Sequence, residues 1–583
     1  MAAISSAIFA ASSQAATPGS LPAQNTAGAT GATFAGGATI NGGASFLSSI
    51  PADNTVSLIG TINPDPADVG KEADIFVGAK IGNSFFQFDG SAFTPWAVDL
   101  KSTTLGLVPS DTKTLAASEA ISVPDLEGAF GQELDGDGLV KIYMAYAPTG
   151  ESDLTYSSKG VKFTVSNPPA ESCPAGTTFQ ATQVLGANDL CVLSGNYTDD
   201  LHLTANFDYI ISGAVKIGDD NQFDTILTID PGVTTYGQSG NDFLWIDRGA
   251  QIWANGTAEN PITMTSANDL TATETTRGEW GGLVINGNAP INGCAEGTEL
   301  CEAAGEGNSG LFGGNDPADS SGSLTYIRVK YAGFLINDLD ELNGIAFQGT
   351  GSGTNVDYVQ VHNNQDDGIE FFGGTTNAKH LYLTGNRDDS LDWTKGWTGK
   401  VQHLVIVQGT DTGDQGMEMD NNGDAPDSLP RAQPIISNAT LIGNANTDIG
   451  MLIREGTGGN FYNFVVTGFG DGCIDIDTPE TFSAAGSSAT DLSGVLTMGS
   501  SVVDCDTNFI EESGDAFMVG DWFLEQTGNM EMTTGMTTYT NSTSVDGLTG
   551  MDVSTMDSFF DATDHVGAVP GDNDWISGWT FIP

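Results

Sequence analysis

The sequence predicts an all-β protein in which a small β-sandwich precedes a long parallel β-helix. Two observations predict the β-helix. Short segments with apolar–polar–apolar alternation recur every 22 to 34 residues between residues 344 and 477, and a second apolar pair precedes most of them. Such periods are typical of solenoids, and alternation with period two is typical of strands with one buried face. A third observation, short strands separated by turn clusters without helical periodicity, predicts the sandwich.

The repeat aligns on a small residue that comes just before each strand. The residues in register are Gly344, Gly368, Ser390, Gly416, Gly450 and Cys473. The first and third residues after each are apolar, as Ile369 and Phe371 are, and are expected to point inward. The residue between them is expected to point outward, and this row is Ala346, Glu370, Asp392, Glu418, Leu452 and Asp475. The preceding strands carry inward pairs such as Leu381 and Leu383. Two strands joined by polar corners describe one β-helix coil.

The chain divides into five predicted segments. Residues 1–15 have the apolar stretch of a signal peptide with cleavage before Ala16, although its positive n-region is missing. Residues 16–52 are rich in Gly, Ala and Thr and predict a linker. The β-sandwich is expected at 53–170, the β-helix at 171–520 and a C-terminal cap at 521–583, with Trp575 and Trp579 covering the last coil.

The composition excludes several classes of partner. With 75 acidic and 18 basic residues the net charge is −57, so nucleic acids and anionic membranes would be repelled. Charged residues make up only 16% and apolar residues 39%, which is a foldable composition. After residue 15, no apolar stretch is long enough for a membrane span.

Six cysteines fall into local couples and predict disulfides. An even number of cysteines behind a signal sequence is typical of an oxidising compartment, and no CxxC pattern suggests zinc. Six cysteines allow 15 pairings. Sequential pairing is expected, as Cys173–Cys191, Cys294–Cys301 and Cys473–Cys505.

Stacked coils would place acidic side chains directly above one another. Besides the outward row, a corner row lies two residues before each register position, with Asp367 and Asp389 beside it. Like charges one strand spacing apart require a cation or hydrogen-bond donors, and dense carboxylate oxygens suit calcium. The predicted calcium ligands are Asp366, Asp388, Asp389, Asp414, Glu370, Asp392, Glu418 and Asp420. The alternative remains open that the corner aspartates only bond backbone amides in turns.

A family resemblance rests on the segment GTAENPITMTS at residues 256–266 and on the coils that follow. It resembles the entry coils of secreted β-helix proteins. From residue 173 onward the chain is similar to the right-handed parallel β-helices of the pectate-lyase-like group, and more narrowly to secreted proteins of Gram-negative bacteria. The resemblance implies a secreted protein, extracellular or on the outer cell surface.

The resemblance also raises the question of catalysis. Polygalacturonase-like hydrolases of this fold carry three aspartates, which Asp367, Asp388 and Asp389 resemble, but also Gly-His-Gly and Arg-Ile-Lys motifs that this sequence lacks. A lyase would need a basic residue, for which Arg387 and Lys395 are the nearby candidates. Trp397 and Phe372 are the candidates for stacking on a sugar.

The favoured interpretation is a calcium-stabilised binding or structural protein. Its expected partner is an extracellular glycan, a neighbouring surface protein or a second copy of the chain. A polysaccharide lyase or glycoside hydrolase remains the alternative.

Overall fold

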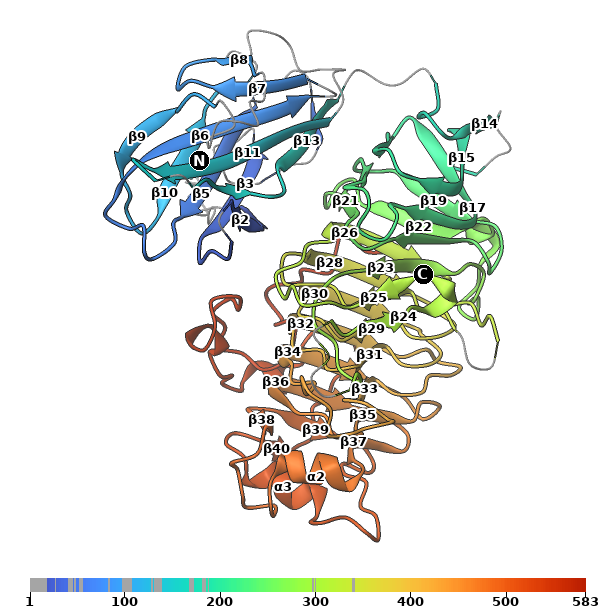
Figure 1. Ribbon diagram of the computed structural model, residues 1–583. Helices are drawn as coiled ribbons and strands as arrows, with labels where there is room; N and C mark the ends of the chain where they lie inside the picture. Colours follow the sequence, from blue (N-terminus) through green and yellow to red (C-terminus); the bar gives the residue numbers. More distant parts are fainter. Residues whose placement is uncertain are drawn as a thin grey trace, which may run out of the picture. The chain divides into compact units, whose positions relative to one another are not determined.

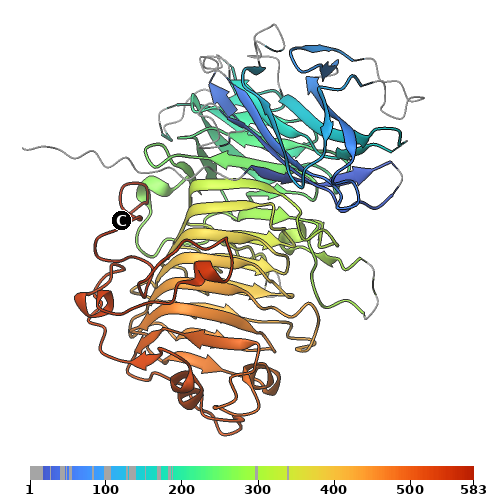
Figure 2. The same ribbon diagram turned by 90° about the vertical axis from the view of Figure 1, so that its left-hand side faces the viewer.

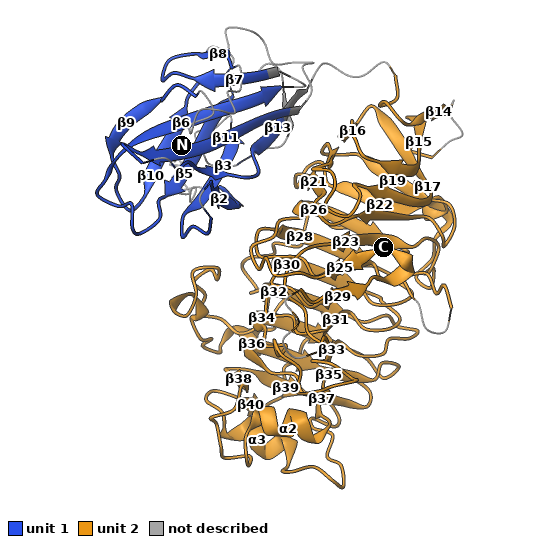
Figure 3. Cartoon of the chain, viewed as in Figure 1, with its two compact units in different colours: residues 1–168 blue, residues 169–583 orange. Residues whose placement is uncertain are grey.

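The computed structural model describes residues 18–26, 28–39, 46, 49–51, 56–81, 84–96, 107–126, 129, 139–151, 153–166, 172–180, 185–186, 188–295, 298, 300–337 and 341–582. The predicted signal peptide, residues 1–15, lies outside them. The chain forms two compact units, Met1–Pro168 and Pro169–Pro583 (Figure 3). No helix of the described residues is long and apolar enough to cross a membrane.

Unit 1 is built from two mainly antiparallel sheets that share one apolar core. The first sheet contains β1 (Gly19–Leu21), β3 (Thr33–Thr39), β5 (Ser57–Asn63) and β10 (Glu119–Val123). The second contains β2 (Ala23–Asn25), β12 (Thr155–Ser157), β11 (Leu139–Pro148), β6 (Glu72–Ile81), β7 (Ser84–Phe88), β8 (Phe93–Pro95), β9 (Asp111–Thr114), β13 (Val161–Ser166) and β4 (Ser49–Pro51). Phe34 and Leu58 of the first sheet share the core with Ile75 and Ile142 of the second, as in a β-sandwich.

The predicted linker is wrong for much of residues 16–52. Strand β3 pairs with β5 over seven residues, and Phe34 and Ala38 are buried. Small residues in this segment are needed for close packing: a Cβ on Gly36 would lie 2.6 Å from Val161. The sequence therefore has few bulky side chains here because the sheet leaves no room for them.

Unit 2 is a parallel β-helix, as predicted. Its sheet of 25 strands follows sequence order, and the register pairs are parallel apart from β14 with β15. Figure 1 shows the coils stacked from green to orange. The first coils contain β14 (Thr178–Gln180), β15 (Asp189–Tyr197), β16 (Leu201–Leu203), β17 (Phe207–Ile217), β18 (Ile226–Ile229), β19 (Thr234–Gly237), β20 (Phe243–Ile246), β21 (Gln251–Asn255), β22 (Ile262–Ser266) and β23 (Gly282–Asn286).

Two families of strands alternate through the regular coils. The short strands of the repeat are β27 (Ile345–Gln348), β29 (Ile369–Phe372), β31 (Leu391–Thr394), β33 (Met417–Met419), β35 (Ile449–Ile453) and β37 (Gly472–Ile476). The longer strands form the flank sheet: β26 (Gly322–Lys330), β28 (Asn355–His362), β30 (Asn377–Thr384), β32 (Lys400–Val407), β34 (Ile435–Ile442) and β36 (Gly459–Thr467). Between β23 and β26 an insertion carries the hairpin of β24 (Ala303–Ala304) and β25 (Leu311–Phe312).

The predicted register is confirmed. Ile345 pairs with Ile369, Ile369 with Leu391, and Leu391 with Met417. The inward side chains fill one continuous core, in which the Phe371 ring stacks on Phe347 at 5.1 Å and on Trp397 at 4.2 Å. All three predicted disulfides are present, Cys173–Cys191, Cys294–Cys301 and Cys473–Cys505.

The C-terminal segment differs from the predicted end cap. Helices α2 (Pro479–Ala485) and α3 (Val519–Glu525) and the short strands β38 (Leu496–Gly499), β39 (Val502–Asp504) and β40 (Met530–Glu531) lie at the last coils (Figure 1). After α4 (Thr543–Asp546), residues 551–582 run back across the flank sheet toward earlier coils (Figure 2). Trp575 and Trp579 therefore pack against Tyr358, far from the last coil. Side-chain amides of the flank sheet satisfy the backbone of this segment.

Candidate cation site on the acidic ladders

Acidic side chains stack on three successive short strands, as the register predicted. Glu370 on β29 pairs with Asp392 on β31, which pairs with Glu418 on β33. We call this the strand row. Neighbouring strands lie about 4.8 Å apart, so three like charges follow one another at that spacing.

A second row lies at the corner that precedes each of these strands, and its side chains cap the next coil. We call Asn343, Asp367, Asp389 and Gln415 the inner row. Oδ1 of Asn343 accepts a hydrogen bond from the backbone N–H of Asp367. In the same way, Oδ1 of Asp367 accepts from the N–H of Asp389 and Oδ1 of Asp389 from the N–H of Gln415, at 2.7–3.2 Å. Oε1 of Gln415 then accepts from the N–H of Ile449 at 3.1 Å. The turn-capping alternative is therefore correct for one oxygen of Asp367 and of Asp389.

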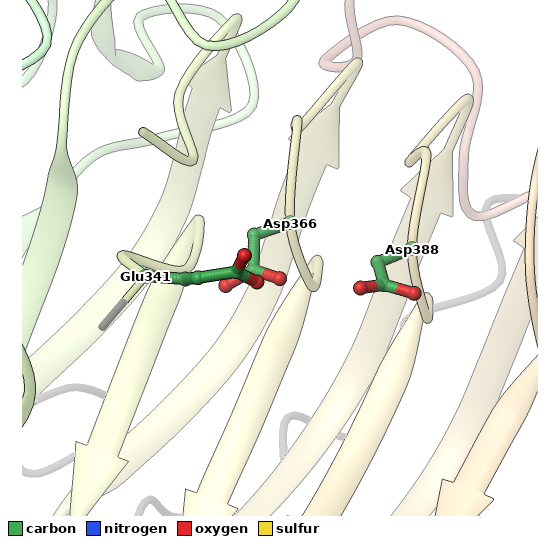
Figure 4. Close-up of side chains that lie close together, drawn as sticks. All are labelled: Glu341, Asp366 and Asp388. Carbon is green, nitrogen blue, oxygen red and sulfur yellow. The ribbon is translucent and has the colours of Figure 1, made fainter. Parts of the chain in front are cut away.

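In the corner row proper, Asp366 is buried, Asp388 and Asp414 are partly buried and Asp448 is exposed. Glu341 and Asp366 approach each other, and Asp388 of the next coil points toward them (Figure 4). A cavity of about 300 Å³ continues past the next corners, and its lining includes Gln365, Arg387, Asp388, Asp414, Asn446 and Asp448.

Four groups of carboxylates each bring three oxygens within 4.8 Å of one another. They are Glu341/Asp366/Asp388, Asp367/Glu370/Asp392, Asp367/Asp388/Asp389 and Asp389/Asp392/Glu418. Oδ1 of Asp392 is fully buried and accepts no hydrogen bond from any described residue. An unpartnered buried carboxylate oxygen among further carboxylates could serve as a ligand of a metal ion.

Burial shifts the protonation of these groups strongly. It raises the pKa of Asp366 to about 9, and the adjacent Glu341 and Asp388 raise it further. Burial also raises the pKa of Glu418 to about 7, although the charge of Arg454 opposes this. For Asp367, Asp389, Glu370 and Asp392 burial, followed by the surrounding carboxylates, holds the pKa well above its usual range. Without a bound cation, several of these groups would be protonated at neutral pH.

Asp420 differs from its predicted role. Its Oδ1 accepts from Nε of Arg454 at 2.9 Å, and Arg454 also pairs with Glu418. Among the described residues Asp420 joins none of the carboxylate groups. It is neutralised by an arginine because the next coil places Arg454 beside it.

The predicted sugar-stacking residues are also placed differently. Trp397 is fully buried, and its Nε1 donates to the carbonyl of Thr376. Phe372 is 7% exposed and packs edge-on against Phe312 of the insertion. Neither ring can stack on a glycan, because the core and the insertion cover them.

The three aspartates of the catalytic alternative, Asp367, Asp388 and Asp389, bring oxygens within 4.8 Å of one another, but they and Arg387 differ in exposure. Arg387 is exposed and lines the cavity together with Asp388. Asp367 and Asp389 are buried below it, at 6% and 5% exposure. Sequence reasoning missed Glu341, which lies one residue before the expected corner; the acidic segment DLDEL around it was the available signal.

A comparison with known protein families agrees with this architecture. The family model described as a pectate-lyase like beta helix domain matches residues 195–580. Among solved structures, the catalytic unit of a thermostable GH87 alpha-1,3-glucanase from Streptomyces thermodiastaticus strain HF3-3 is similar, with 11% identity and a TM-score of 0.28 over 88% of this chain and 97% of that chain. No curated protein gives a significant match. Since the matched domain spans well over half of the residues, the chain belongs to the pectate-lyase-like β-helix family.

Proposed function

We propose that the acidic ladders bind calcium and that the calcium-stabilised β-helix serves as an extracellular binding or structural protein. Its partner would be a glycan, a neighbouring surface protein or another copy of the chain. The supporting observation is the inner row, in which amide and carboxylate side chains alike accept a hydrogen bond from a backbone N–H of the next coil. Asn343 and Gln415 show that a neutral side chain is sufficient to cap a coil. The charges of Asp367 and Asp389 therefore serve another purpose.

The local charge balance supports a cation. Arg454 is engaged by Glu418 and Asp420, and Arg387 lies on the exposed side of the corner row. The buried carboxylates between them have no described basic side chain in ion-pair contact. Calcium takes about six to eight oxygen ligands, and stacked carboxylates supply them without the nitrogen or sulfur ligands that zinc prefers.

The compartment is part of the same proposal. Three disulfides fit an oxidising environment, and extracellular fluids supply calcium at concentrations that weak sites can use.

Metal analysis and a matched pair of variants test the calcium site. The purified protein is analysed for bound metal, and its thermal unfolding is measured with calcium and with EDTA. We expect EDTA to lower the Tm by several degrees and Asp392→Asn to abolish most of this difference. Asp475→Asn is the control, because Asp475 occupies the same outward position two coils beyond Glu418 but joins no carboxylate group of the described residues. Equal Tm values with calcium and EDTA would reject the proposal.

A polysaccharide lyase is the second candidate, and one observation favours it. Arg387, an exposed base, lines the same cavity as Asp388, Asp414 and Asp448. Incubation with a panel of uronic-acid polymers and calcium would reveal unsaturated chain ends if the protein cleaves them. Arg387→Ala should then abolish product formation, while the difference in Tm between calcium and EDTA remains. Binding of a polymer without new chain ends would favour the binding protein.

A further inference from the structure

The C-terminal residues 551–582, which we call the strap, lie across the flank sheet. Side chains of the sheet form hydrogen bonds to the backbone of the strap. Gln360 donates to the carbonyl of Phe581 and accepts from its N–H, at 2.7 Å each. Gln402 makes the same pair of bonds with Asp561, at 3.0 and 2.7 Å. These contacts hold the strap without depending on its side chains.

Stacked rings of the flank sheet lie beneath the strap. Tyr326 stacks on Tyr358 at 4.3 Å, Tyr358 on His380 at 4.1 Å, and His380 on His403 at 4.8 Å. Trp575 and Trp579 of the strap meet these rings edge-on. The strap thus covers a row of stacked rings. Figure 2 shows its backbone crossing the strands of the flank sheet.

Four of the five histidines of the chain lie in this interface. His362 is 5% exposed, bonds Thr384 at 2.8 Å and lies under the ring of Phe581 at 5.2 Å. His403 is 8% exposed, and its Nδ1 has no hydrogen-bond partner among the described residues. The other two histidines of the interface are His380 and His565.

Both buried imidazoles are held neutral by their surroundings. Burial, then the charges of Lys330 and Arg277, lower the pKa of His362 to about 3. Burial, then His380, His565 and Lys379, hold the pKa of His403 well below its usual range.

Charged groups from every packed element face these histidines. Asp561 of the strap lies 3.9 Å from His403 and pairs with Lys379, and Asp357 contacts His380 at 2.7 Å. The other ion pairs of the interface are Lys330–Asp269 and Lys400–Asp557. Among the described residues, Asp561 is the carboxylate within 4.0 Å of His403. Its side chain is 55% exposed, so solvent screens its charge and the effect of burial on the pKa of His403 is larger.

We propose that the strap is a pH-sensitive device, in which protonation of His362 and His403 below neutral pH releases residues 551–582 and uncovers the stacked rings of the flank sheet. In the released state both imidazoles are solvated and titrate near pH 6.5. A group whose pKa is lower when the strap is bound stabilises attachment above pH 6.5 and progressively less below it. Each buried histidine weakens attachment about tenfold per pH unit, so two of them predict a change of up to about 1,000-fold at pH 5.

Hydrogen exchange of the full chain tests this directly. Protection factors of strap amides, corrected for intrinsic rates, are compared at pH 7, at pH 5 and below pH 4 with those of β34 and β36. We expect strap protection to fall at least about 100-fold relative to these strands. His202→Gln, which changes the one histidine outside the interface, should show the same fall, whereas His362→Gln/His403→Gln should show little.

Two outcomes would overturn the proposal. Strap protection that stays within about threefold of the reference strands shows that the histidines do not control attachment. A loss that begins only below pH 4 assigns the effect to carboxylates of the interface instead. Both readings come from the wild-type protein, so they hold even if the double variant fails to fold.

Discussion

The backbone N–H of Asp389 donates a hydrogen bond to Oδ1 of Asp367, 3.1 Å away on the preceding coil. Asn343, one coil earlier, makes the same bond with a neutral oxygen. We therefore expect Asp367→Asn to retain the bond and to remove the cost of burying an ionisable carboxyl group, so that it raises the free energy of unfolding in EDTA by about 1–3 kcal/mol.

The matched control is Asp367→Ala, which removes the acceptor as well as the charge. It leaves the N–H of Asp389 without its partner and should be less stable than Asp367→Asn by roughly 1–3 kcal/mol. Chemical denaturation in EDTA measures both. Equal stabilities for the two variants would mean that the inner row does not cap the coils.

The raised pKa values of the ladders predict how stability depends on pH in EDTA. Burial raises the pKa of Asp366 to about 9 and that of Glu418 to about 7. The folded state then binds more protons than the unfolded state, so stability is lost as pH rises through these values. We expect the Tm in EDTA to rise as pH falls from 9 to 7, a range above the titration of solvated histidines.

Saturating calcium is the control for this pH dependence. It stabilises the ionised carboxylates, so the Tm should become nearly independent of pH over the same range. A Tm that rises with pH in EDTA would contradict the raised pKa values.

Local patterns predicted the β-helix core and its register. Inward pairs such as Ile369 and Phe371 repeat with period two, and a slip of one residue would expose every one of them. The same constraint fixed the stacking of Glu370, Asp392 and Glu418, because outward positions follow from inward ones.

Contacts between distant segments could not be predicted. Arg454 neutralises Asp420 from another coil, and Trp397 turns inward to stack on Phe371. The path of the strap depends on pairs such as Gln360 with Phe581, which are 221 residues apart. No periodicity connects such residues. The small side chains of β3 also misled the prediction, because close sheet packing and a flexible linker favour the same composition.

Trp397 provides a test of core packing against ligand stacking. Its ring is fully buried and lies 4.2 Å from Phe371. We expect Trp397→Ala to lower the free energy of unfolding by about 3–5 kcal/mol, since it leaves a cavity. Trp397→Phe should recover a large part of this. If glycan binding fell in Trp397→Phe while stability did not, the ring would have to be accessible, contrary to its burial.

The long-range disulfide should contribute more than the local one. Cys473–Cys505 closes a separation of 32 residues and Cys294–Cys301 one of 7. Chain entropy predicts losses of about 3.7 and 2.4 kcal/mol for the two double serine variants. Denaturant titration under identical conditions compares them. A larger loss for Cys294–Cys301 would show that the bond positions the insertion rather than restricting the unfolded chain.

Arg454 links the ladders to the rest of the β-helix. Arg454→Gln leaves Glu418 and Asp420 unpaired, and we expect it to cost about 2–3 kcal/mol in EDTA, less than a fully buried pair because Arg454 is 34% exposed. Calcium should recover more stability in this variant than in the wild type, since Glu418, a member of one carboxylate group, becomes free to bind it. Arg431→Gln is the control: Arg431 donates to the carbonyl of Gly456 and to Asp427, away from the carboxylate groups. The loss of stability caused by Arg431→Gln should be the same with calcium and with EDTA. Equal recovery in both variants would place the calcium site away from Glu418.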